Sequence, residues 1–158
     1  GAPSEAELKS RKEAFEDAIS ATKAAVAEGI VPGGGLTLIR ASDALLLEEQ
    51  KREGDERSGI RILRHALDMP ARQIAVNSGV DAGVVVDRMR NGKDSYGFDA
   101  AKGTYVDLVA EGIIDPTKVV RVALENAVSV AGVLLLTEAT MTELPDSARE
   151  NRPAAELE

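Results

Sequence analysis

Hydrophobic positions recur at helical spacing through most of the chain, and glycine or proline separates the segments. The first predicted helix covers residues 5–28, because Ser4 and Glu7 have the spacing of a capping box and Gly29 follows the last turn. A long helix with one narrow apolar stripe is typical of a connection between two bodies, and a plain surface helix is the alternative. The stripe consists of Leu8, Phe15, Ile19, Thr22 and Val26.

The middle of the chain is predicted to be helical on both sides of a polar connector, residues 51–58. Three consecutive glycines at 33–35 follow a short extended piece at 30–31 and precede a helix over 36–50. Pro70 removes one backbone hydrogen bond from the next helix and therefore predicts a kink in it. That helix begins near Asp55 or Ser58 and ends at Ser78 and Gly79, and a further helix over 82–90 is capped by Asp81 and directs Val84, Val85 and Val86 inward.

A short β-hairpin is predicted next, with a strand over 95–98 and a turn at Lys102 and Gly103. Residues 105–111 are predicted to form a short helix that Gly112 ends. The sequence therefore predicts a mainly α fold that contains one small β element.

The final helix is predicted to begin at Asp115 as N-cap, with Pro116 at the first helical position, and to reach about Thr137. Because this helix is apolar on several faces, we expect it to be central and buried. Residues 139–144 alternate weakly and predict a C-terminal strand without a partner in the chain. The charged, proline-containing residues 146–158 predict a disordered tail.

Composition narrows the class of protein. The chain has 158 residues, of which 44% are hydrophobic and 3% aromatic, and this favours one domain of helices packed through aliphatic side chains. A formal charge of −8 argues against binding to nucleic acid or to anionic membranes. The absence of cysteine excludes disulfides and thiolate chemistry and is compatible with a cytoplasmic location. Arg121 and Glu125 interrupt the most apolar run, which favours a soluble helix over a membrane span.

Four places carry candidate chemistry, and each has a structural alternative. The glycines at 33–35 expose amide donors at a helix N-terminus, or they form only a turn. The small residues of Asp99-Ala100-Ala101 allow close approach of a ligand, or only tight packing. Asp115 offers a carboxylate, or serves only as a cap. Asp17 stands among several carboxylates on a solvated helix, and His65, the only histidine, has no evident partners for a metal site.

The order and spacing of these motifs resemble the C-terminal part of the group I chaperonins, the GroEL family. The resemblance covers residues 5–145, and its most specific segment, residues 96–119, reads YGFDAAKGTYVDLVAEGIIDPTKV. The second motif is Val31-Pro32-Gly33-Gly34-Gly35. In that family the two motifs line one side of an ATP site.

The resemblance implies a role for each candidate residue. The middle glycine, Gly34, lies against the nucleotide, and Asp99, Ala100 and Ala101 lie at the adenine edge, where Asp99 replaces the asparagine more common in the family. The carboxylate of Asp115 accepts a hydrogen bond from a ribose hydroxyl. Asp17 orients the attacking water, and does so only when its helix rotates towards the site.

The resemblance also predicts the organisation and the partners. Residues 1–29 correspond to an intermediate-domain helix and 30–145 to the C-terminal half of an equatorial, ring-forming domain of helical-bundle type. The intact protein is then expected to fold proteins with ATP or ADP and magnesium, and to form rings with identical subunits. The phosphate loop and the metal-binding aspartate belong to the N-terminal half of the family, so no metal ligand is expected here. Co-chaperonin and unfolded proteins would bind the apical domain.

The same residues leave two other interpretations open. One is a stable segment of the same ancestry that is catalytically inactive and binds no nucleotide by itself. The other is an unrelated helical interaction module, which would require the motif order and spacing to match by chance. For the isolated chain we expect no ATP hydrolysis.

Overall fold

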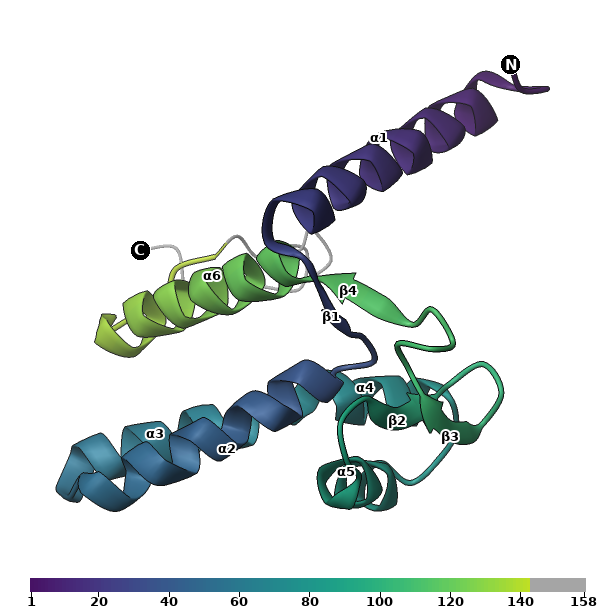
Figure 1. Cartoon of the computed structure of the whole chain (residues 1–158). Helices are drawn as coiled ribbons and strands as arrows, with labels where there is room; N and C mark the ends of the chain where they lie inside the picture. The colour runs from purple at the N-terminus through teal and green to yellow at the C-terminus, as the bar shows by residue number, and fades with distance from the viewer. Residues whose placement is uncertain (143–158) are drawn as a thin grey trace, which may run out of the picture. The chain divides into compact units, whose positions relative to one another are not determined.

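The structure is a computed structural model, and it describes residues 1–142 of the 158. Two compact units are present, Gly1–Val122 and a second unit that begins at Ala123. Helices dominate both, which confirms the mainly α class (Figure 1). The helices are α1 (Glu5–Glu28), α2 (Leu36–Lys51), α3 (Gly54–Ala66), α4 (Met69–Asn77), α5 (Ala82–Asn91) and α6 (Thr117–Leu136), and the strands are β1 (Ile30–Pro32), β2 (Tyr96–Asp99), β3 (Thr104–Asp107) and β4 (Ile114–Pro116).

The hydrophobic core lies in the first unit, where α2, α4 and α5 pack with the β2–β3 hairpin. Each helix places apolar residues on one face at spacings of three or four, as amphipathic helices do. Full burial of such a side chain contributes about 1.5–3 kcal/mol. The buried cluster consists of Leu36, Ile39, Ala71, Ala75, Val85, Val86, Met89, Phe98 and Leu108.

Two pairs of antiparallel strands complete the first unit (Figure 1). In one pair Ile30 lies opposite Pro116 and Val31 lies opposite Asp115, so β1 and β4 join distant parts of the chain. In the other pair, β2 and β3 form the predicted hairpin, with Asp99 opposite Thr104. These strands position the candidate residues.

Local caps explain where two of the helices begin. The hydroxyl of Ser4 accepts a hydrogen bond from the amide of Glu7 at 3.3 Å, and Gly29 ends α1 with a φ of 80°. The carboxylate of Asp81 accepts from the amide of Val84 at 2.9 Å and begins α5. Both caps confirm the prediction. No residue of α1 is buried.

The predicted kink at Pro70 is instead a break between two helices. α3 ends at Ala66, α4 begins at Met69, and the proline occupies the first turn of the new helix. That position tolerates proline, because its missing N–H would have no partner there in any case. The polar connector is also shorter than predicted, since α3 already begins at Gly54.

The prediction of a helix over residues 105–111 was wrong. Residues 104–107 form β3, because Tyr105 and Val106 pair with Phe98 and Gly97 and bury part of their surface against the core. Asp107 then ends the strand, since its carboxylate accepts from the amides of the second and third residues that follow it. The inward direction of Val84 was also wrong, because its side chain is half exposed while the next two valines are buried.

Helix α6 is less buried than predicted. It begins at Thr117, and none of its residues is buried within the described part of the chain, so the expected central position is not present there. By length and composition alone this helix could also cross a membrane. Residues 139–142 lie in no strand, because a strand needs a partner and this segment has none among residues 1–142. The rest of that predicted strand and the predicted disordered tail lie outside the described residues.

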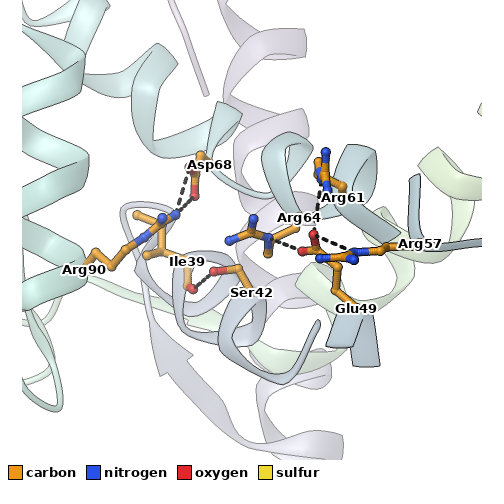
Figure 2. A network of polar contacts seen from close by, with 8 residues as sticks. All are labelled: Ile39, Ser42, Glu49, Arg57, Arg61, Arg64, Asp68 and Arg90. Atoms are coloured by element: carbon orange, nitrogen blue, oxygen red, sulfur yellow. Dashed lines mark hydrogen bonds and ion pairs between the residues drawn. The ribbon is translucent and has the colours of Figure 1, made fainter. Parts of the chain in front are cut away.

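Two buried carboxylates fasten the helices of the first unit to one another (Figure 2). Glu49 of α2 is 5% exposed and contacts Arg57, Arg61 and Arg64 of α3, and the hydrogen bond from Arg61 is the main cause that holds the pKa of this carboxyl below its usual value. Asp68, before α4, accepts from Arg90 of α5 at 2.7 and 2.9 Å. The scaffold beneath the candidate residues is therefore held by charge as well as by apolar packing.

Candidate functional site

Three segments that are distant in the sequence meet at the start of α2. A methyl group built on Gly33 would lie 3.4 Å from the carboxylate oxygen Oδ2 of Asp115, and one built on Gly34 would lie 3.7 Å from the carbonyl oxygen of Phe98. The glycine turn thus adjoins the end of β2 on one side and β4 on the other. The structure thus places Gly34 beside β2, which ends at Asp99 and leads into Ala100 and Ala101, and it places the neighbouring Gly33 beside Asp115; Asp17 is not among these residues.

The glycine turn leaves amide donors available at the N-terminus of α2. Gly34 and Gly35 have φ values of 63° and 78°, a backbone conformation that glycine adopts without strain. Within the described residues, no hydrogen bond is formed by the N–H of either glycine, and α2 has no side-chain cap. A helix N-terminus with free N–H groups attracts anions. The turn can therefore bind a negatively charged group.

Gly35 has a packing role in addition. A methyl group there would lie 2.7 Å from the backbone nitrogen of Ala71, which is closer than carbon and nitrogen atoms approach. Only glycine allows the start of α2 to contact α4 at this point. The third glycine of the motif is thus required by the fold itself.

The carboxylate of Asp99 faces inward. Its side chain is 5% exposed, and Oδ1 accepts hydrogen bonds from the amides of Ala101 at 2.9 Å and Lys102 at 3.2 Å. The carbonyl oxygen of the same residue accepts from Gly103 at 2.8 Å, which closes the loop between β2 and β3. The atoms that the loop exposes are those of Ala100, Ala101, Lys102 and Gly103. A ligand at this edge would meet those atoms rather than the carboxylate.

The prediction that Asp115 is the N-cap of the last helix was wrong. Asp115 lies within β4, because the ladder with β1 includes it, and α6 begins two residues later. Hydrogen bonds on both sides fix its backbone: Gly33 donates to Ile113 at 2.9 Å and Thr117 donates to Gly29 at 3.1 Å. Its half-buried carboxylate forms no hydrogen bond or ion pair within residues 1–142. This side chain is therefore available to accept hydrogen bonds from a ligand.

Asp17 lies apart from these residues. It is exposed on α1, 12 positions before Gly29, which corresponds to about 18 Å along a helix axis. No hydrogen bond or ion pair of its side chain is found in the described part of the chain. A shallow hollow of about 270 Å³ lies on the same helix and includes none of the candidate residues. Its lining residues are Phe15, Ala18, Ile19, Thr22 and Lys23.

Lys102 and Glu111 are part of the local geometry and were not among the predicted residues. The ammonium group of Lys102 lies 3.6 Å from Oδ2 of Asp99 and donates to Oε2 of Glu111. This hydrogen bond, more than any other cause, raises the pKa of Lys102. The order Asp-Ala-Ala-Lys-Gly is typical of an aspartate that caps its own turn and could have indicated the inward carboxylate.

Metal ligands are not gathered at this place. Within residues 1–142 no group of three or more histidine, cysteine or carboxylate side chains is arranged to hold a metal ion. His65 is exposed on α3. The arrangement can accept a hydroxyl donor, bind an anion and contact a planar group, but it holds no metal centre of its own in the described residues.

Two comparisons with known proteins agree with the resemblance. The model of the TCP-1/cpn60 chaperonin family matches residues 1–145. Chaperonin GroEL 5 of Bradyrhizobium diazoefficiens is 68% identical over 157 residues, which are 99% of this chain and 29% of that protein. The chain thus spans less than a third of the length of this curated relative.

Proposed function

This chain belongs to the TCP-1/cpn60 chaperonin family and is a segment of a group I chaperonin, and we propose that it supplies one side of the nucleotide site of an ATP-dependent protein-folding machine. The observation that supports this proposal is the meeting of the glycine turn, the end of β2 and Asp115 at the N-terminus of α2, with the β2–β3 loop directly after β2. These groups come from residues up to 81 positions apart, from Gly34 to Asp115.

The three groups fit the three parts of a nucleotide. The free N–H groups of Gly34 and Gly35 suit a phosphate. The unpaired carboxylate of Asp115 suits the hydroxyl groups of a ribose, which donate hydrogen bonds. The exposed backbone of Ala100 and Ala101 offers carbonyl acceptors to the exocyclic amine of adenine. Lys102 partly offsets the negative charge of Asp99, which otherwise would disfavour an anionic ligand.

Magnesium and the reacting phosphate need groups that the described residues do not gather. Magnesium bound to a nucleotide would neutralise phosphate charge, and the residues that hold it are expected in other parts of the protein. We propose that Asp17 orients the attacking water, which requires α1 to move towards the site. The chain alone would then bind nucleotide weakly and would not hydrolyse it.

The exposed apolar faces of α6 support assembly with other chain segments or subunits. Val130, Val133 and Leu134 are each more than half exposed, and a helix that is apolar on several faces is normally buried. We propose packing within a cytoplasmic chaperonin ring, rather than a membrane, as the environment of α6. Co-chaperonin and unfolded proteins would bind a different domain of the intact protein.

A segment without any nucleotide binding is the second candidate. It is favoured by the absence of a metal-binding group among residues 1–142 and by the inward carboxylate of Asp99. In this case the glycine turn and the β1–β4 pair would serve the fold alone.

Calorimetric titration of the chain with ATP and with ADP, in the presence of magnesium, separates the two candidates. Asp115→Ala removes the free carboxylate, and Asp87→Ala on the exposed face of α5 is the matched control. Gly34→Ala strains the turn, and Gly79→Ala is its control, because Gly79 has a similar φ of 74° and open space around it. We expect each site variant to weaken binding about tenfold or more and the controls to leave it unchanged. No heat at millimolar nucleotide would favour the inactive segment.

A further inference from the structure

Lys102 links two carboxylates at the edge of the candidate site. Its ammonium group lies 3.6 Å from Oδ2 of Asp99 and donates a hydrogen bond to Oε2 of Glu111. Asp99 ends β2, Lys102 lies in the loop after it, and Glu111 lies in the turns that follow β3. One side chain therefore connects the loop of the hairpin to the segment that leads into β4.

The loop has few other anchors. The amides of Ala101 and Lys102 donate to Oδ1 of Asp99, and Gly103 donates to its carbonyl oxygen. All three bonds end on Asp99, and the two from Ala101 and Lys102 depend on where its carboxylate points. Lys102 holds the second oxygen of that carboxylate, and Glu111 holds Lys102. The direction of the carboxylate is thus fixed from outside the loop.

We propose that Asp99, Lys102 and Glu111 form a clamp that keeps residues 100–103 in the shape that receives the base, so that Lys102 and Glu111 are positioning residues. The proposal rests on the nucleotide site proposed above. It assigns the contact with the ligand to the backbone of Ala100 and Ala101, because the side chain of Asp99 is only 5% exposed and is bonded within its own turn. Neither Lys102 nor Glu111 needs to touch the ligand.

Loss of the ion pairs in the clamp should shift the equilibrium between the closed and open loop by a definite factor. Partly exposed ion pairs change a conformational equilibrium by a factor of about two to five. When the binding-competent loop is less populated, the apparent affinity for a ligand falls by the same fraction. Loss of the clamp should therefore speed loop opening by this factor and lower the nucleotide affinity by no more than the same factor.

Amide hydrogen exchange of the unliganded chain, followed by NMR, tests the clamp without any ligand. We expect exchange at Ala101 and Lys102 to become about two to five times faster in Lys102→Met and in Glu111→Gln. Lys102→Arg keeps the charge and should retain most of the protection. Lys93→Met is the matched control, because Lys93 is exposed and forms no ion pair within residues 1–142. Unchanged exchange in the first two variants would overturn the clamp.

Titration of the same samples with ADP tests the positioning role. We expect chemical-shift changes at Ala100 and Ala101 in the wild-type chain, and a measurably lower affinity, by up to the factor seen in exchange, in Lys102→Met and Glu111→Gln. Faster exchange with unchanged affinity would overturn the positioning role while leaving the clamp in place. No response of the wild-type chain to ADP would overturn the nucleotide site and the positioning role together, whereas exchange alone still decides the clamp.

Discussion

The side chain of Leu108 fills the space beneath Gly97, at the floor of the candidate site. A methyl group built on Gly97 would lie 2.5 Å from Cδ1 and 3.0 Å from Cγ of Leu108, and 3.4 Å from Cδ2 of Leu36. Favourable contacts between carbon atoms are about 3.5–4.0 Å, so the added methyl overlaps its neighbours. Both leucines are 0% exposed, so they must shift within the core to relieve the overlap. We expect Gly97→Ala to lower the free energy of unfolding by about 1–3 kcal/mol.

The double substitution Gly97→Ala with Leu108→Ala should lower the free energy of unfolding by much less than the sum of the two single substitutions. Leu108→Ala alone removes a fully buried side chain and should cost about 2–5 kcal/mol, because a cavity remains. In the double variant the methyl group added at position 97 enters that cavity, and the two Leu108 atoms with which it overlapped most closely are gone. We expect the double variant to be more stable than additivity predicts by about 1–2 kcal/mol.

Urea unfolding followed by far-UV circular dichroism measures this coupling, with m-values compared across the four chains. Gly59→Ala is the control, because Gly59 lies in α3 with no atom within 4 Å of an added methyl group. Combined with Leu108→Ala, it should be additive within about 0.5 kcal/mol. Additive behaviour of the Gly97 and Leu108 pair as well would refute the packing described for the floor of the site.

Three further substitutions test other parts of the fold. Asp81→Ala removes the cap of α5 and should cost about 1 kcal/mol in urea unfolding, whereas Asp87→Ala within the same helix should cost less than half of that. Glu49→Gln should lower stability at neutral pH. Because arginine contacts lower the pKa of Glu49 from 4.5, the difference from wild type should be full above pH 4.5 and shrink below it, and a difference independent of pH would contradict this. Gly35→Ala should cost at least about 2 kcal/mol more than Gly79→Ala, since both have positive φ and only the first methyl meets a backbone; equal thermal stabilities would contradict this.

Signals that act within a few residues were sufficient to predict much of the fold. Ser4 and Asp81 cap their helices as the sequence predicts, because at a helix N-terminus the capping side chain and the amide three positions later are close and no distant partner is needed. In α5, Val85 and Val86 are buried, as the sequence predicts. Val84 was an exception, because three adjacent valines cannot all lie on one side of a helix.

Features that depend on distant partners could not be predicted in this way. Tyr105 and Val106 favour a strand by type, yet the apolar spacing of 105–111 also suits a short helix, and pairing with β2 decides between them. Asp115 has the local sequence pattern of a helix cap. It pairs instead with Val31 of β1, which lies more than 80 positions earlier in the chain. Spacing alone gives no reason for Gly34 and Asp115 to be near each other, and only the family resemblance predicted it.

The pairing of β1 with β4 also sets the order in which the chain can reach its final form. Ile30 lies opposite Pro116, 86 positions later, and the ladder contains only three residues on each side. Closing so large a loop for so few hydrogen bonds is favourable only after the intervening helices have condensed. The same ladder can open locally while the core remains folded. A nucleotide that contacts both Gly34 and Asp115 would then stabilise the closed ladder. Ligand-dependent protection of the ladder amides from hydrogen exchange would report when this last step of folding has taken place.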